Sequence, residues 1–133
     1  MLRRLATMLP VLALLLVMAA PTVLAEEPTK VEEGWGNQAC DGYKIDPVED
    51  GHVAFPDGAW FHIDVYWDNG WVFDWSSNLE VDSVVVKGGT GYLTYFYDDA
   101  GSGEGLHAPT NPKNKHGYWY GLSHLCFDGE KKK

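Results

Sequence analysis

One segment of this 133-residue chain, Trp60–Trp67, follows the two-residue period of a β-strand and no helical period. Alternate residues of a strand point to opposite faces. Two sets result: Phe61, Ile63, Val65 and Trp67 on one face, and Trp60, His62, Asp64 and Tyr66 on the other. Asp68-Asn69-Gly70 follows, and Asn and Gly accept the positive φ angles of a tight hairpin turn. The segment therefore predicts an antiparallel hairpin whose apolar face lies in a core, with Trp71–Trp75 as the return strand.

Strand signals continue along the chain, and no stretch has helical periodicity. Val84-Val85-Val86 is apolar on both faces, which is typical of a central strand. Further strands are predicted at Tyr43–Ile45, His52–Phe55, Val81–Lys87, Tyr92–Tyr97 and Leu122–Phe127. Six or seven short strands without a helix predict an all-β fold, an antiparallel β-sandwich. A small β-barrel is the alternative.

The first 25 residues have the features of a secretory signal peptide. Arg3 and Arg4 are followed by an apolar run over residues 11–20 and by a small residue, Ala25, as the cleavage point. We expect secretion, with no stable membrane insertion after cleavage. Residues 26–37 are charged and have little to bury, which predicts a flexible leader. The β-sandwich domain is expected over residues 38–128, and residues 129–133 form a charged, lysine-rich tail.

The chain has two cysteines, Cys40 and Cys126, near opposite ends of the expected domain. In a secreted protein, two cysteines predict one intramolecular disulfide. Two separate free thiols are the alternative.

Aromatic residues are the main functional clue. The chain has six tryptophans and seven tyrosines, more than a small core needs, and exposed aromatic side chains often contact sugars or protein partners. Trp60 and Tyr66 fall on the face opposite the core. Tyr118 and Trp119 follow a glycine- and proline-rich stretch, residues 98–117, that predicts a long loop, either functional or disordered. These four residues are the candidate binding residues, and burial of the aromatic side chains is the alternative.

No catalytic or metal-binding motif is apparent. The five histidines lack the spacing of metal ligands, and Asp46, Glu49 and Asp50 follow no calcium-loop pattern. A net charge of −9 disfavours nucleic acid as a partner. We expect no cofactor, no metal and no catalytic residue. The rival enzyme hypothesis would require His62, Asp64, His107 and His116 to converge.

Four strings together resemble a group of small secreted or surface-displayed bacterial modules, largely of unknown function: FDWSSN (73–78), VDSVVVKGG (81–89), GLHAP (105–109) and GLSHLCF (121–127). The resemblance covers about residues 38–128. It implies a disulfide-closed β domain in an extracellular setting, with no catalytic residues to transfer.

The combined expectation is a secreted, monomeric, non-catalytic module that binds or adheres through exposed aromatic residues. The expected partner is an extracellular glycan or a protein surface. The alternatives are a structural extracellular domain without a small-ligand site, and a small secreted hydrolase or metal-binding protein.

Overall fold

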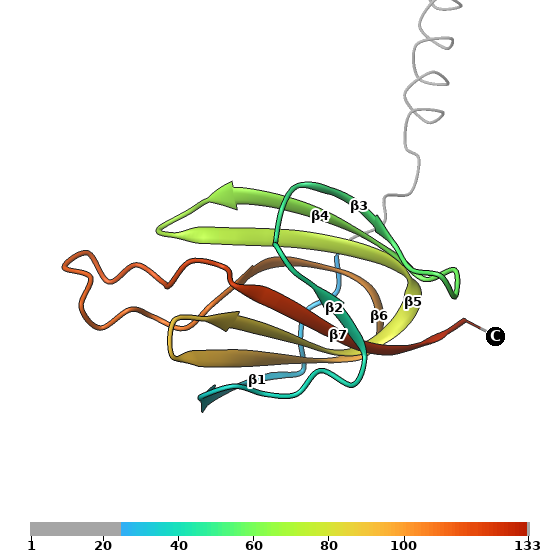
Figure 1. The fold of residues 1–133 in the computed structure, drawn as a ribbon, viewed down its shortest axis with the longest axis horizontal. Coiled ribbons are helices and arrows are strands. Elements are labelled where there is room, and N and C mark those ends of the chain that lie inside the picture. Colours follow the sequence, from blue (N-terminus) through green and yellow to red (C-terminus); the bar gives the residue numbers. More distant parts are fainter. Residues whose placement is uncertain (1–24, 133) are drawn as a thin grey trace, which may run out of the picture.

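A computed structural model describes residues 25–132, which form seven β-strands and no helix (Figure 1). All strand pairs are antiparallel and belong to one sheet. The strands are β1 (Lys30–Trp35), β2 (Tyr43–Ile45), β3 (Gly51–Ala54), β4 (Trp60–Trp67), β5 (Trp71–Gly88), β6 (Gly91–His107) and β7 (His124–Lys131). The predicted signal peptide, residues 1–25, lies outside this range except for Ala25. No helix that could span a membrane occurs in the described residues.

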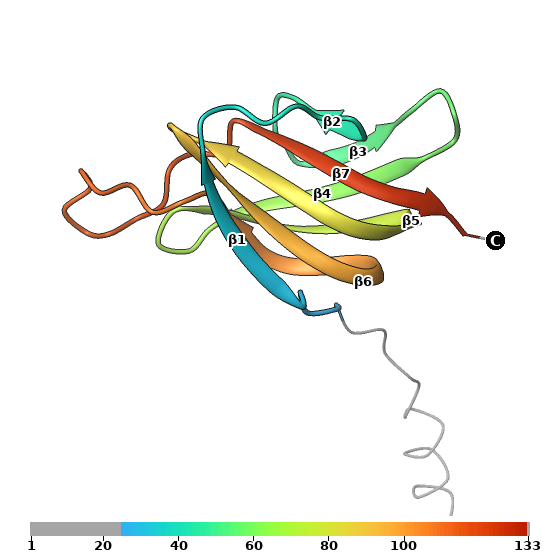
Figure 2. The same ribbon diagram turned by 90° about the horizontal axis from the view of Figure 1, so that it is seen from below.

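Two long strands, β5 and β6, fold this sheet over itself (Figures 1 and 2). Residues 71–77 of β5 pair with β4, whereas residues 79–87 pair with β7. β6 accompanies β5 through both parts, and the register between them shifts at residues 73–75 and 76–83. Such irregularities increase local bending and twist. The bend therefore places β3, β4 and the first part of β5 in one layer, and β2, β7 and the second part of β5 in the other.

The core lies between the two layers. Phe61 of β4 and Phe127 of β7 are fully buried, and their ring centroids are 4.4 Å apart. The ring of Trp75 of β5 packs edge-on against the Phe127 ring, with centroids 5.3 Å apart. The sheet does not close into a barrel. The predicted antiparallel sandwich is confirmed, in the form of one sheet folded over its own core.

The predicted hairpin and central strand are also confirmed. Trp67 pairs with Trp71 across the turn, where Asn69 has φ 60° and Gly70 has φ 131°. Val84 and Val86 are fully buried, and Val85 is 7% exposed on the other face. This part of β5 is a central strand, because β6 pairs with one of its edges and β7 with the other.

The predicted disulfide is confirmed and fastens a crossover. β1 and β2 pair at opposite edges of one layer, so residues 36–42 must cross its outer face (Figure 2). Cys40 in this crossover is bonded to Cys126 of β7, with Cα atoms 5.7 Å apart. Cys126 pairs with Val85, so the disulfide lies beside the buried outer face of the central strand.

The flexible leader predicted at residues 26–37 is wrong for half of its length, because Lys30–Trp35 forms β1. Its side chains are mostly exposed, as the composition suggested. Backbone pairing with β6 orders it instead, from Lys30 opposite Phe96 to Trp35 opposite Gly91. Gly34 lies against the Tyr92 ring, where a Cβ would be 2.2 Å from Cζ. The folded unit therefore begins before residue 38.

The long loop predicted at residues 98–117 is also wrong in its first half, because β6 continues to His107. Gly103 has a packing role there, since a Cβ on it would lie 2.4 Å from Trp75 Nε1 and 2.5 Å from the Tyr97 hydroxyl. The strand predicted at Val81–Lys87 is part of a longer strand, β5, which begins at Trp71.

The charged tail predicted at residues 129–133 is also wrong for its larger part. β7 extends to Lys131, so residues 129–131 belong to a strand.

A pH-dependent stability effect is expected at Asp82, which lies at the bend of β5. Desolvation, followed by the neighbouring Asp99, raises the pKa of the Asp82 carboxyl above 3.8. Ionisation of Asp82 therefore costs stability at neutral pH, and this cost is relieved as pH falls through the folded-state pKa. Asp82→Asn should raise the urea midpoint at pH 7, with a gain that disappears in acid. Asp41→Asn, at an exposed position of the crossover, is the control. A gain independent of pH would contradict this cause.

Candidate functional site

Three aromatic side chains gather where the β4–β5 hairpin ends, and we call Trp67, Trp71 and Tyr118 the aromatic cluster. Trp67 is 55% exposed and Trp71 46% exposed. The Trp67 ring stands edge-on to Trp71 at 5.3 Å and to Tyr118 at 5.5 Å. Trp67 is the last residue of β4 whose side chain is on the core face, and Trp71 is the first such residue of β5. At this end of the sheet the opposite layer no longer covers them. The fold thus leaves apolar rings in solvent at this end.

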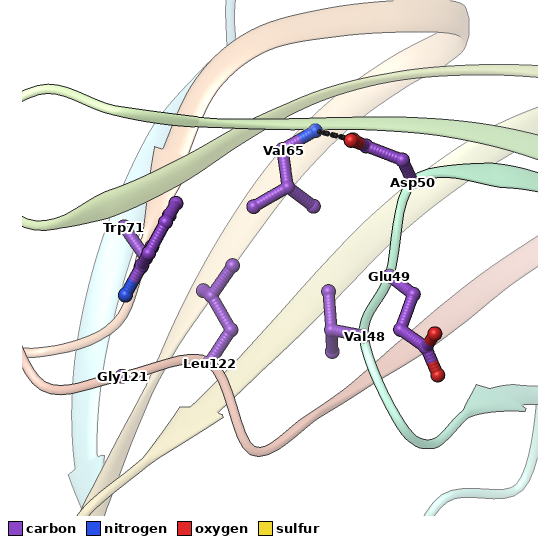
Figure 3. Close-up of a pocket in the computed structure, with 7 residues that line it drawn as sticks. All are labelled: Val48, Glu49, Asp50, Val65, Trp71, Gly121 and Leu122. Atoms are coloured by element: carbon purple, nitrogen blue, oxygen red, sulfur yellow. Dashed lines mark hydrogen bonds between the residues drawn. The ribbon is translucent and has the colours of Figure 1, made fainter.

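A cavity of about 520 Å³ lies beside the cluster and shares Trp71 with it (Figure 3). We call this cavity the edge groove. Val65 and Trp71 come from one layer, and Leu122 comes from the segment before β7 in the other layer. In Figure 3 their side chains and that of Val48 face a common space. The remaining lining residues are Glu49, Asp50 and Gly121.

The connection between β2 and β3 supplies the acidic side of the edge groove. Asp50 Oδ1 accepts a hydrogen bond from the Val65 backbone N–H at 2.5 Å, which holds this connection against β4. Glu49 and Asp50 are both exposed. Within residues 25–132 the only ion pair joins Lys30 and Glu32, so neither groove carboxylate is paired with a cation of this part of the chain.

The segment between β6 and β7 is ordered and supports the cluster. Its two arms are hydrogen-bonded, from Tyr120 N to Pro109 O and from Asn111 N to Tyr118 O, both at 2.9 Å. Trp119 stacks on His107 with ring centroids 3.7 Å apart. A Cβ on Gly70 would lie 2.4 Å from the Trp119 ring, so the loop packs directly against the hairpin turn. The aromatic cluster is therefore held by two elements that contact each other.

The four predicted binding residues do not form one platform. Tyr118 joins the aromatic cluster, whereas Trp119 packs on His107. Trp60 lies at the other end of β4, half-buried and 5.4 Å from His52. Tyr66 is 37% exposed but points to the face opposite Trp67.

Tyr66 is held by its own polar contact. Its hydroxyl donates a hydrogen bond to Asp74 Oδ1 at 2.9 Å. Desolvation, this hydrogen bond and the nearby carboxylates raise the pKa of Tyr66 to about 12. Tyr66 is therefore a neutral donor engaged on the outer face of β4 and β5.

Sequence reasoning missed Trp67 and Trp71, because period-two alternation assigned both to the core face. The alternation correctly predicted that both side chains lie on the core face of their strands. The available signal was their position next to the turn, where the last residues of an inward row extend past the core.

The histidines and carboxylates considered for catalysis lie at separate places. His62 and Asp64 line a cavity of about 220 Å³ on the outer face of β4 and β5, with Asp74, Trp75 and Ser76. His107 is stacked on Trp119, and His116 is stacked on Tyr118 at 5.2 Å. No group of three or more His, Cys, Asp or Glu side chains in residues 25–132 is arranged to hold a metal ion.

Comparison of the chain with models of protein families, with curated proteins and with solved structures finds no match in any of the three. The resemblance to secreted bacterial modules stays a prediction. Function is therefore inferred from the site itself.

Proposed function

We propose that this protein is a secreted, non-catalytic saccharide-binding module, with the edge groove and the aromatic cluster as its binding site. The observation that carries the proposal is the pair of exposed tryptophans, Trp67 and Trp71, beside an open cavity of about 520 Å³. The electron-rich face of an aromatic ring attracts polarised C–H groups, such as those on a sugar ring. Carboxylates at the same site accept hydrogen bonds from hydroxyl groups.

The size of the site favours a compact ligand over a protein surface. Cavities of about 300–1,000 Å³ are typical of small-ligand sites, whereas a stable protein interface buries about 800 Å² on each partner. The exposed large apolar side chains of the described residues are Val31, Trp35, Tyr66, Trp67 and Trp71. Val31 and Trp35 belong to β1 at a free edge of the sheet, and only Trp67 and Trp71 adjoin the groove.

The confirmed disulfide supports an extracellular location, because disulfides persist in oxidising compartments. The predicted signal peptide agrees with an extracellular location. Secretion is therefore part of the proposal.

Replacing Trp71 by Ala is expected to weaken binding of the best ligand in a glycan panel by at least about fivefold, because truncating a central aromatic contact costs more than about 1 kcal/mol. Tryptophan fluorescence during titration measures the affinity. Trp35→Ala is the matched control, because Trp35 is 67% exposed and does not line the groove. Equal losses in both variants would contradict the assignment of the site, and absence of binding to every glycan would refute the proposed function.

A further inference from the structure

The edge groove has a charge pattern that a neutral ligand would not use. Two of its seven lining residues, Glu49 and Asp50, are acidic, and none is basic. Neither acidic residue is paired with a Lys, Arg or His of the described chain. Each carboxylate therefore has capacity left for a cation that comes from outside, and Asp50 uses one oxygen for the Val65 N–H.

The aromatic side of the groove attracts the same kind of group. A tryptophan face attracts an ammonium ion when the ion lies within about 6 Å of the ring. Trp71 is the aromatic residue that lines the groove, and Trp67 stands edge-on to it at 5.3 Å. In Figure 3, Trp71 and the connection that carries Glu49 and Asp50 lie at opposite sides of the common space, so a ligand along the groove would have an aromatic ring at one side and this acidic connection at the other.

We infer that the saccharide bound in the edge groove carries protonated amino groups, as in an oligomer of glucosamine. This inference rests on the proposed function and names the ligand class for the same site. Ring C–H groups of the sugar pack on Trp71, and an ammonium group pairs with Glu49 or Asp50. The oligosaccharide lies along an open groove, so its ends can continue beyond the site.

The test compares two oligosaccharides that differ only in the state of their amino groups. Glucosamine hexamer and N-acetylglucosamine hexamer have the same linkage, length and ring faces, but only the first has free amines. At low salt and slightly acidic pH, the oxidised protein should bind the glucosamine hexamer about tenfold or more tightly than the acetylated one. The difference should shrink as ionic strength increases, because exposed charge pairs are screened.

Two neutralising substitutions locate the effect. The double variant Glu49→Gln, Asp50→Asn keeps the size of both side chains, and the amide introduced at position 50 retains an oxygen that can accept the Val65 N–H. It should lower the affinity for the glucosamine hexamer by about tenfold and leave binding of the acetylated hexamer unchanged. Glu33→Gln removes one negative charge at an exposed position on β1, outside the groove, and should change neither affinity.

The outcomes separate this inference from the proposed function. Equal affinity for the two hexamers, or equal loss in the Glu33→Gln control, overturns the amino-sugar assignment while saccharide binding stands. Binding of another neutral glycan but of neither hexamer also overturns it. Stronger binding of an oligolysine peptide than of the glucosamine hexamer overturns it as well, because the site would then recognise a cationic peptide.

Discussion

Reduction of the Cys40–Cys126 disulfide is expected to lower the free energy of unfolding by up to about 4–5 kcal/mol. The bond closes a sequence separation of 86 residues, and the chain-entropy model gives a cost of this size for a loop of that length. It also fastens the crossover on the outer face of β5 and β7, so its loss releases Cys40 and the segment between β1 and β2. For a single domain, the loss is a large fraction of total stability.

Urea unfolding of the oxidised and reduced protein measures this loss. The double variant Cys40→Ser, Cys126→Ser removes the bond without reductant, and reductant should then have no further effect on it. An unchanged unfolding midpoint after complete reduction would contradict the stabilising role of the bond.

Replacing Phe127 by Ala is expected to cost about 3–5 kcal/mol of unfolding free energy, as for other fully buried aromatic residues. Phe127 is 0% exposed and contacts Phe61 at 4.4 Å and Trp75 at 5.3 Å, so its ring joins the two layers. Its removal leaves a cavity in the region where the folded sheet packs on itself. Chemical denaturation with a fixed m-value measures the change.

Phe96→Ala is the matched control for this substitution. Phe96 of β6 is only half-buried and lies under Lys30 Nζ, which is 4.7 Å from the ring centroid. The control should cost clearly less than Phe127→Ala. Equal costs would contradict a core located between the layers.

The sequence predicted the fold where local signals agree with one another. Alternation in Trp60–Trp67 and the Asn69-Gly70 turn identified the first hairpin, and the valines at residues 84–86 identified the central strand. The cysteines predicted the correct bond because only one intramolecular pairing was available.

The sequence predictions are wrong where the structure of a segment depends on contacts with residues that are distant in the sequence. The backbone of β1 pairs with the edge of β6, and the composition of residues 30–35 gives no sign of this pairing. Gly103 allows Trp75 and Tyr97 to approach closely, although glycine by itself favours a loop. Trp67 and Trp71 belong to the correct face of their strands, but only the extent of the opposite layer decides that they are exposed.

The most direct test of the binding site is the set of indole N–H signals of the six tryptophans in a ¹H–¹⁵N spectrum, recorded during titration with a bound oligosaccharide. The proposed site predicts that the signals of Trp67 and Trp71 shift in proportion to saturation, while those of Trp35 and the buried Trp75 stay in place. Shifts of Trp35 or Trp60 with unchanged signals from Trp67 and Trp71 would place the ligand elsewhere and contradict the proposed site.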